Sequence, residues 1–162
     1  MITFTRGSIF DCGADILVNP VNCIGVMEKG LALEFKKRYP DMYKTYRTLC
    51  DEGLLEPGLL HIWLDNDSGK HIINFPTKDH WRNPSKYEYI ENGLASLQSW
   101  LNRNGTDKKI AIPPLGCGNG GLDFDKVSRM IVGALETLRV NAYLYCPPGY
   151  EPNLSLVINK FE

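Results

Sequence analysis

The sequence predicts a single α/β domain in which helices cover the faces of a mixed β-sheet. Short apolar runs rich in branched residues alternate with longer segments of helical periodicity, which is typical of layered α/β proteins. The 162 residues are 43% hydrophobic and 23% charged, which suits one core and leaves no room for a second domain. No internal repeat or low-complexity segment is present in the sequence. We therefore expect residues 1–162 to form one domain.

Six segments are predicted as strands because each is short and apolar and most are bounded by turn-forming residues. The sequence Asn-Asp-Ser-Gly at 66–69 predicts a hairpin turn, so part of the sheet is expected to be antiparallel. The predicted strands are residues 2–5, 15–18, 59–63, 71–75, 109–112 and 142–146.

Helices are predicted in most of the gaps between these strands. Apolar residues at positions 90, 94, 97 and 101 share one helix face, and those at 127, 130, 131, 134, 135 and 138 share another. Positions 31, 35 and 39 indicate a short helix that Pro40 stops. A further helix is expected from Asp41 to about Cys50, with Gly53 near its end.

Charge and cysteine content exclude several classes of protein. The formal net charge is -1, so no overall field attracts nucleic acid or an anionic membrane. The N-terminus begins on a predicted strand without a signal sequence, and no apolar run is long enough to span a bilayer. The five cysteines lack metal-ligand spacing, which favours reduced thiols. We expect a cytoplasmic protein that does not contact membranes.

The most informative segment is the glycine-rich connection that follows the strand predicted at 109–112. Residues 113–123, Pro-Pro-Leu-Gly-Cys-Gly-Asn-Gly-Gly-Leu-Asp, run from that strand directly into a helix. Glycine lets a backbone approach an anion closely, and successive N–H groups at a helix start attract phosphate. The spacing fits neither a P-loop nor G-x-G-x-x-G. One interpretation is a phosphate cradle, and the other is a tight strand-to-helix turn.

Two further loops are predicted at the same end of the sheet. Residues 19–32 also lead from a strand into a helix and could form the opposite wall of a crevice, with Asn22 bonded to a sugar hydroxyl. Residues 74–85 carry Lys78, His80 and Arg82 within five positions. A lysine there binds phosphate or, when uncharged, attacks an electrophilic sugar carbon. The alternatives are that Asn19 and Asn22 only close turns and that Lys78 lies in a solvated basic loop.

These segments, in this order, resemble the macrodomain family over nearly the whole chain. Residues 18–23 and 113–118 are similar to the loops with which the family holds the distal ribose and the diphosphate of ADP-ribose. The resemblance implies a three-layer α/β/α sandwich with a six-stranded mixed sheet. Within the family, residues 25–32, 74–78 and 120–123 resemble the DarG branch. These antitoxins remove ADP-ribose from thymidine bases of DNA and so reverse a DarT-type toxin.

The resemblance also implies roles for individual residues. Lys78 would be the main catalytic group, acting on the anomeric carbon of the distal ribose, and Asn22 would hold that ribose. Asp123 would assist release of the sugar, while a plain N-cap is the alternative. His80 would donate a proton to the departing base or contact the DNA. The residues implied to bind ADP-ribose are Ser8, Ile9, Asn22, Gly25, Val26, Met27, Lys29, Gly30, Thr77, Gly116, Cys117, Gly118, Asn119, Gly120, Gly121 and Leu122.

Two positions depart from the family pattern. Many macrodomains carry an aspartate near the adenine where this chain has Ser8, whose oxygen accepts the same hydrogen bond without charge assistance. Glu28 stands where a small residue is expected. Because its carboxylate would repel a diphosphate, we expect it to face solvent.

The implied reaction is hydrolysis without a metal or cofactor, with ADP-ribose as ligand and product. The implied partners are ADP-ribosylated single-stranded DNA and a DarT-type toxin, and the chain is expected to be a monomer. Three alternatives stay open. They are a hydrolase of protein-linked ADP-ribose or ADP-ribose esters, a non-catalytic ADP-ribose-binding module, and a thiol enzyme that uses Cys117 or Cys23.

Overall fold

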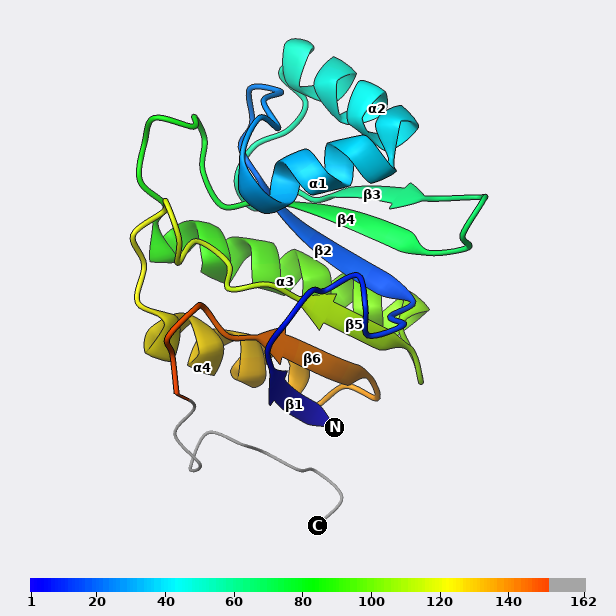
Figure 1. The fold of residues 1–162 in the computed structure, drawn as a ribbon, viewed down its shortest axis with the longest axis vertical. Coiled ribbons are helices and arrows are strands. Elements are labelled where there is room, and N and C mark those ends of the chain that lie inside the picture. Colours follow the sequence, from blue (N-terminus) through cyan, green and yellow to red (C-terminus); the bar gives the residue numbers. More distant parts are fainter. Residues whose placement is uncertain (152–162) are drawn as a thin grey trace.

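The computed structural model describes residues 1–151 as a mixed β-sheet between two layers of helices (Figure 1). The six-stranded sheet has the order β1-β6-β5-β2-β4-β3, in which only β3 and β4 pair in the antiparallel direction. The strands are β1 (Ile2–Thr5), β2 (Ile16–Val21), β3 (His61–Leu64), β4 (His71–Pro76), β5 (Lys109–Ile112) and β6 (Asn141–Tyr145). The predicted six-stranded mixed sheet and its hairpin are confirmed.

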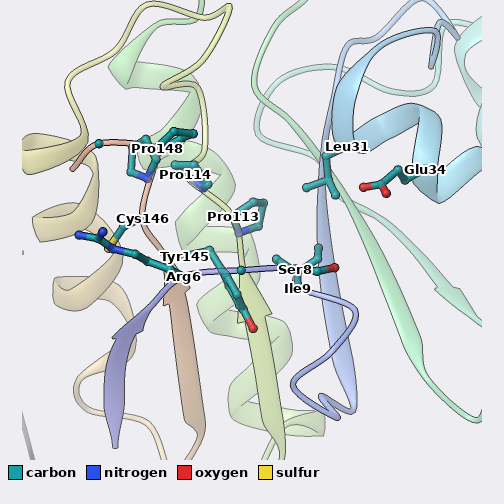
Figure 2. A pocket seen from close by; sticks show the side chains of 13 residues that line it. Arg6, Ser8, Ile9, Leu31, Glu34, Pro113, Pro114, Tyr145, Cys146 and Pro148 are labelled. Atoms are coloured by element: carbon teal, nitrogen blue, oxygen red, sulfur yellow. The ribbon is translucent and has the colours of Figure 1, made fainter. Parts of the chain in front are cut away.

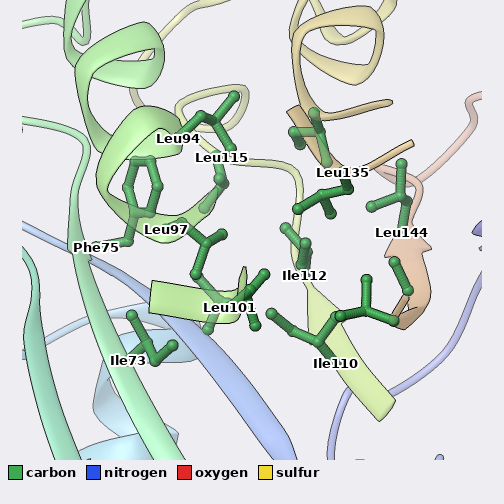
Figure 3. Packing of buried hydrophobic residues seen from close by; sticks show 14 of the residues in the cluster. Ile73, Phe75, Leu94, Leu97, Leu101, Ile110, Ile112, Leu115, Leu135 and Leu144 are labelled. Atoms are coloured by element: carbon green, nitrogen blue, oxygen red, sulfur yellow. The ribbon is translucent and has the colours of Figure 1, made fainter. Parts of the chain in front are cut away.

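Two helices cover each face of the sheet. Helices α1 (Gly30–Arg38) and α2 (Pro40–Asp51) pack on one face, and α3 (Tyr87–Asn104) and α4 (Phe124–Leu135) pack on the other. Side chains alternate along each strand, so Ile73 and Phe75 of β4 join the α3/α4 core while Ile72 joins the α1/α2 core. Figure 3 shows the α3/α4 core, which is mostly aliphatic.

The α1/α2 face buries a row of polar side chains across three strands. Asn19, Asn74 and His61 lie opposite one another on β2, β4 and β3. Asn19 Nδ2 donates to Asn74 Oδ1 at 3.0 Å, and Asn74 Nδ2 donates to Nδ1 of His61 at 2.9 Å. Because Nδ1 accepts this bond, the imidazole is neutral, and burial lowers the pKa of His61. We call these three residues the polar ladder.

Strand β2 is longer than the predicted 15–18 because its proline costs no ladder bond. Pairing with β5 is confined to Ile16 and Leu17, whereas pairing with β4 continues to Val21. Pro20 therefore lies where β2 has no β5 neighbour, so its missing N–H is tolerated. The extension carries the chain directly to Asn22.

Other predicted boundaries are wrong by a few residues. Helix α4 ends at Leu135, and Leu138 packs against the core from the turn that follows. Pro40 begins α2 instead of lying outside it, since the first turn of a helix needs no N–H there. Predicted strands 59–63, 71–75 and 142–146 are His61–Leu64, His71–Pro76 and Asn141–Tyr145.

The chain changes direction between β2 and β5, which are neighbours in the sheet. Strand β2 leads to α1 on one face, whereas β5 leads to α4 on the opposite face. Such a switch point opens a crevice at the carboxyl ends of the strands. Within residues 1–151, none of the helices combines the length and apolar content needed to cross a lipid bilayer.

Candidate active site

A pocket of about 530 Å³ opens at the carboxyl ends of the strands (Figure 2). Its lining comes from the segment after β1, from the start of α1 and from the residues that follow β5 and β6. Two residues implied to bind ligand line it, Ser8 and the buried Ile9. The Ser8 hydroxyl accepts a hydrogen bond from the N–H of Phe10 at 3.2 Å and keeps one lone pair for a ligand.

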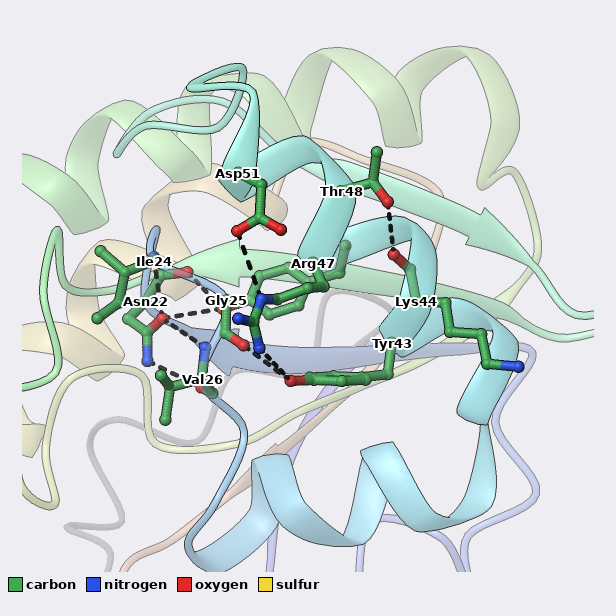
Figure 4. A network of polar contacts seen from close by, with 10 residues as sticks. Asn22, Ile24, Gly25, Val26, Tyr43, Lys44, Arg47, Thr48 and Asp51 are labelled. Carbon is green, nitrogen blue, oxygen red and sulfur yellow. Dashed lines mark hydrogen bonds and ion pairs between the residues drawn. The ribbon is translucent and has the colours of Figure 1, made fainter.

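Asn22 organises residues 22–29, which connect β2 to α1, do not line this pocket, and are called the first wall below. Its Oδ1 accepts hydrogen bonds from the N–H groups of Ile24 (3.1 Å) and Val26 (3.3 Å), and its Nδ2 donates to the Val26 carbonyl at 2.9 Å (Figure 4). The buried Tyr46 hydroxyl lies 2.7 Å from the Asn22 carbonyl and 3.0 Å from Oδ1. Asn22 therefore does close a turn, and within residues 1–151 its second Nδ2 hydrogen has no acceptor.

Helix α2 supports the first wall at Gly25. This residue has φ +88°, and a Cβ there would lie 2.5 Å from Cδ of Arg47. The Tyr43 hydroxyl donates to the Gly25 carbonyl at 2.9 Å, and Arg47 is paired with Asp51 at 3.4 Å (Figure 4). Both the backbone angle and the space thus require glycine.

The remaining first-wall residues differ in what they can offer a ligand. Glu28 is exposed and pairs with Lys36 at 3.0 Å, which confirms that its carboxylate faces solvent. Lys29 is exposed at the N-cap position of α1 and makes no side-chain cap bond. Met27 is fully buried in the α1/α2 core, so any contact it makes with ligand must come from its backbone.

The second wall is the glycine loop, residues 116–122, between β5 and α4. The Leu122 N–H donates to the Gly116 carbonyl at 2.9 Å, which closes the loop on itself. In the described part of the chain, the N–H groups of Gly118, Asn119 and Gly120 have no acceptor. Three consecutive unpaired donors just before a helix fit the predicted phosphate cradle.

Ser85 supports the glycine loop from behind and was not predicted. Its N–H donates to the Gly120 carbonyl at 3.0 Å. A Cβ on Gly120 would lie 2.3 Å from Ser85 Oγ and 2.4 Å from the Gly116 carbonyl oxygen. No local sequence signal points to Ser85, because its partners follow a whole helix and strand later in the chain.

Lys78 follows β4 at the same end of the sheet. Its Nζ donates to the Trp81 carbonyl at 3.3 Å, and no carboxylate of residues 1–151 lies within ion-pair distance of it. The Thr77 N–H donates to the Val21 carbonyl at 2.9 Å, and the Cys23 N–H donates to the Asp79 carbonyl at 3.1 Å. These bonds tie the lysine loop to the segment that carries Asn22.

The side chains of His80 and Asp123 each accept one local hydrogen bond from a backbone N–H. The His80 Nδ1 accepts the N–H of Arg82 at 3.1 Å, so a neutral ring carries its proton on Nε2. This form donates a hydrogen bond, whereas giving up its only proton would leave an imidazolate. Asp123 is the N-cap of α4, with Oδ2 accepting the Lys126 N–H at 3.1 Å. The N-cap alternative thus describes the role that the fold gives this carboxylate.

Burial disfavours the thiolate form of the two candidate thiols, Cys23 and Cys117. Burial raises the pKa of both Cys23 and Cys117 to about 12, which keeps them protonated near neutral pH. This argues against the thiol-enzyme alternative. Within residues 1–151, no group of three or more His, Cys, Asp or Glu side chains could hold a metal ion.

Known proteins share this fold. The Macro domain family model matches residues 18–131. The chain is 46% identical over 153 residues to a DNA ADP-ribosyl glycohydrolase of Mycobacterium tuberculosis, covering 92% of this chain and 43% of that protein. The solved macrodomain of Mycobacterium tuberculosis DarG superposes with a TM-score of 0.86 at 44% identity, covering 91% of this chain and 98% of that one.

A third match includes a ligand. Thermosipho africanus DarTG, solved in complex with ADP-ribose, superposes with a TM-score of 0.84 at 29% identity, covering 94% of this chain and 43% of that one. The chain thus spans less than half the length of the curated relative and nearly all of the solved DarG macrodomain.

Proposed function

This chain belongs to the macrodomain family, and from that premise we propose that it is an ADP-ribosyl glycohydrolase acting on thymidine bases of single-stranded DNA. ADP-ribose is the ligand and product, and neither a metal nor another cofactor takes part. A DarT-type toxin that adds the modification is the proposed functional partner, and the reaction would take place in the cytoplasm. One copy of the chain carries all of the proposed site residues, so a monomer suffices.

The position of Lys78 is the single observation on which this proposal depends. It lies at the carboxyl end of β4, bonded to a backbone carbonyl rather than a carboxylate, beside the segment that carries Asn22. No carboxylate of residues 1–151 lies within ion-pair distance of this amine. We assign it the role of nucleophile at the place where the distal ribose would lie.

The two walls suggest how ADP-ribose binds. Its adenine end fits the pocket beside Ser8 and Ile9, and its diphosphate fits the unpaired N–H groups of the glycine loop. The free Nδ2 hydrogen of Asn22 then meets the distal ribose. In this orientation of ADP-ribose, the anomeric carbon of the distal ribose faces Lys78.

The reaction follows from this placement. The lone pair of Lys78 Nζ attacks the anomeric carbon, and the bond from that carbon to the thymine nitrogen breaks. Its electron pair stays on the base nitrogen, where a hydrogen bond from His80 Nε2 stabilises it until it takes a proton from the Lys78 nitrogen. Water then replaces the amine on the sugar carbon, releasing ADP-ribose and restoring the lysine.

The test is a panel of defined substrates. We expect the purified chain to release ADP-ribose from an oligonucleotide with thymidine-linked ADP-ribose, followed by gel shift and mass, faster than from a serine-linked peptide or an ester-linked one. Preference for either peptide would replace the DNA substrate by a protein-linked one. Tight ADP-ribose binding without release from any of the three would establish a binding module.

A further inference from the structure

The loop between β4 and α3 presents an exposed aromatic ring beside the proposed nucleophile. Trp81 is 45% exposed, whereas the other two tryptophans, Trp63 and Trp100, are partly buried. A tryptophan ring gains stability from burial, so an exposed ring on a structured loop can supply binding energy to a partner. The backbone carbonyl of Trp81 accepts a hydrogen bond from Lys78 Nζ at 3.3 Å, so the residue that bears the ring is tied to that amine.

The loop is held in one shape before any partner arrives. Asp79 Oδ1 accepts the N–H of His80 at 2.7 Å and the Nδ2 of Asn83 at 3.1 Å. These bonds, with Asn83 contributing most, lower the pKa of Asp79. The Asn83 N–H also donates to the His80 carbonyl at 3.0 Å. The ring is therefore presented by an ordered turn, which reduces the entropy lost on binding.

A cation lies beside this ring, although the whole chain is close to neutral. The Arg82 guanidinium lies 4.7 Å from the Trp81 ring centroid, and the His80 ring lies 5.5 Å from it at 32°. An apolar plane beside a cation matches a nucleotide of a single strand, whose base stacks and whose phosphate is anionic. A protein partner would not need this pairing of plane and positive charge.

We propose that Trp81 stacks on a base next to the modified thymidine and that Arg82 contacts the adjoining phosphate, so that the chain recognises the DNA strand as well as ADP-ribose. This inference rests on the proposed function, because it assumes that the modified group is part of a nucleic acid. Trp81 is a specificity-determining residue in this account. It takes no part in breaking the glycosidic bond.

The test compares two ligands with the same linkage. In a Lys78→Ala background, the affinity for an ADP-ribosylated oligonucleotide and for ADP-ribosylated thymidine monophosphate is measured with and without Trp81→Ala. We expect Trp81→Ala to weaken oligonucleotide binding about 5- to 150-fold, the range for loss of one stacked base, and to leave the mononucleotide unchanged. Trp81→Phe should retain most of the affinity, and Arg82→Gln should flatten its salt dependence.

Leu64→Ala is the matched control, since this exposed side chain lies at the opposite end of the sheet, paired with the first residue of β4. It should leave both affinities unchanged. Equal weakening for both ligands, or no weakening for the oligonucleotide, would overturn the inference. Because binding is measured without turnover, failure of the wild-type chain to release ADP-ribose would contradict the proposed function separately.

Discussion

The two faces of the sheet bury different chemistry, and each supports one wall of the cleft. The α1/α2 face contains the polar ladder, and its helix α2 supplies the tyrosine hydroxyls that hold the first wall. The α3/α4 face is mostly aliphatic, and its wall is the glycine loop, held by backbone bonds and close contacts with Ser85. Side-chain hydrogen bonds therefore shape one wall, whereas backbone hydrogen bonds and steric packing shape the other.

This difference teaches how one cleft combines fixed and available polar groups. In the first wall, the Asn22 amide uses its oxygen and one Nδ2 hydrogen internally, so that side chain keeps one hydrogen for a ligand. The glycine loop keeps three N–H groups unpaired, so it offers the donors that a diphosphate needs. Substitutions that remove hydrogen bonds should damage the first wall, while added methyl groups should damage the second.

The largest effect on stability is expected from the polar ladder. Asn74→Leu keeps the volume but leaves His61 and Asn19 without their partner, which should lower the free energy of unfolding by about 2–4 kcal/mol. Urea unfolding followed by circular dichroism measures this. Leu97→Met, a volume-conserving change in the α3/α4 core, should cost under about 1.5 kcal/mol. Equal losses in the free energy of unfolding for the two variants would show that the two faces do not differ in their sensitivity to substitution.

Asn22→Ala should give the next largest loss. It removes the bonds to Ile24 and Val26 and should cost about 1–3 kcal/mol of stability and at least about 10-fold in ADP-ribose affinity by calorimetry. Asn119→Ala is the matched control on the other wall, because only the backbone of Asn119 is assigned a role. Comparable affinity losses for the two asparagines would contradict the division of roles.

Gly120→Ala should weaken ADP-ribose binding through the shape of the glycine loop. The added methyl group would meet Ser85 Oγ at 2.3 Å, so the loop must shift, at a cost of about 1–3 kcal/mol. Gly118→Ala has nothing within 4 Å of the new Cβ and should change the melting temperature little. A Gly120→Ala protein as stable as the Gly118→Ala protein would rule out steric support by Ser85.

Acid should weaken the α1/α2 face through the polar ladder. The folded pKa of His61 is lowered by burial, so below about pH 6.5 the unfolded chain binds a proton that the folded chain does not. The contribution of neutral His61 to the free energy of unfolding is fully present above that pH. It is lost as the pH falls, at no more than about 1.4 kcal/mol per pH unit. His61→Gln should flatten this slope in urea titrations between pH 7 and 5. An unchanged slope would assign the acid sensitivity to other groups.

Much of the fold could be predicted because hydrophobic periodicity reports burial directly. The strand at Lys109–Ile112 and the helix with positions 90, 94, 97 and 101 on its buried face follow from that pattern alone. Strand β2 was predicted too short, because a proline such as Pro20 usually marks the end of a strand. The strand tolerates this proline because β5 stops pairing with β2 before it, and a single sequence does not contain that information.

The candidate site was predictable to the extent that its chemistry is local. The glycine loop and Lys78 stand out in the sequence because glycines before a helix and a lysine after a strand have recognisable uses. Ser85 and Tyr46 do not, because each acts on a distant segment through a contact that the tertiary fold creates. The roles of Lys78, Asn22, His80 and Asp123 in catalysis remain predictions.

The most direct test of the account is the dependence of ADP-ribose release on the Lys78 amine. Initial rates on a thymidine-linked ADP-ribosyl oligonucleotide are compared for the wild type, Lys78→Ala, and Lys44→Ala, which removes an exposed lysine on α2. Free ADP-ribose affinity is measured for all three. We expect Lys78→Ala to lose at least about 100-fold in rate with nearly unchanged affinity, and Lys44→Ala to match the wild type. A Lys78→Ala protein that releases ADP-ribose at the wild-type rate would contradict the account.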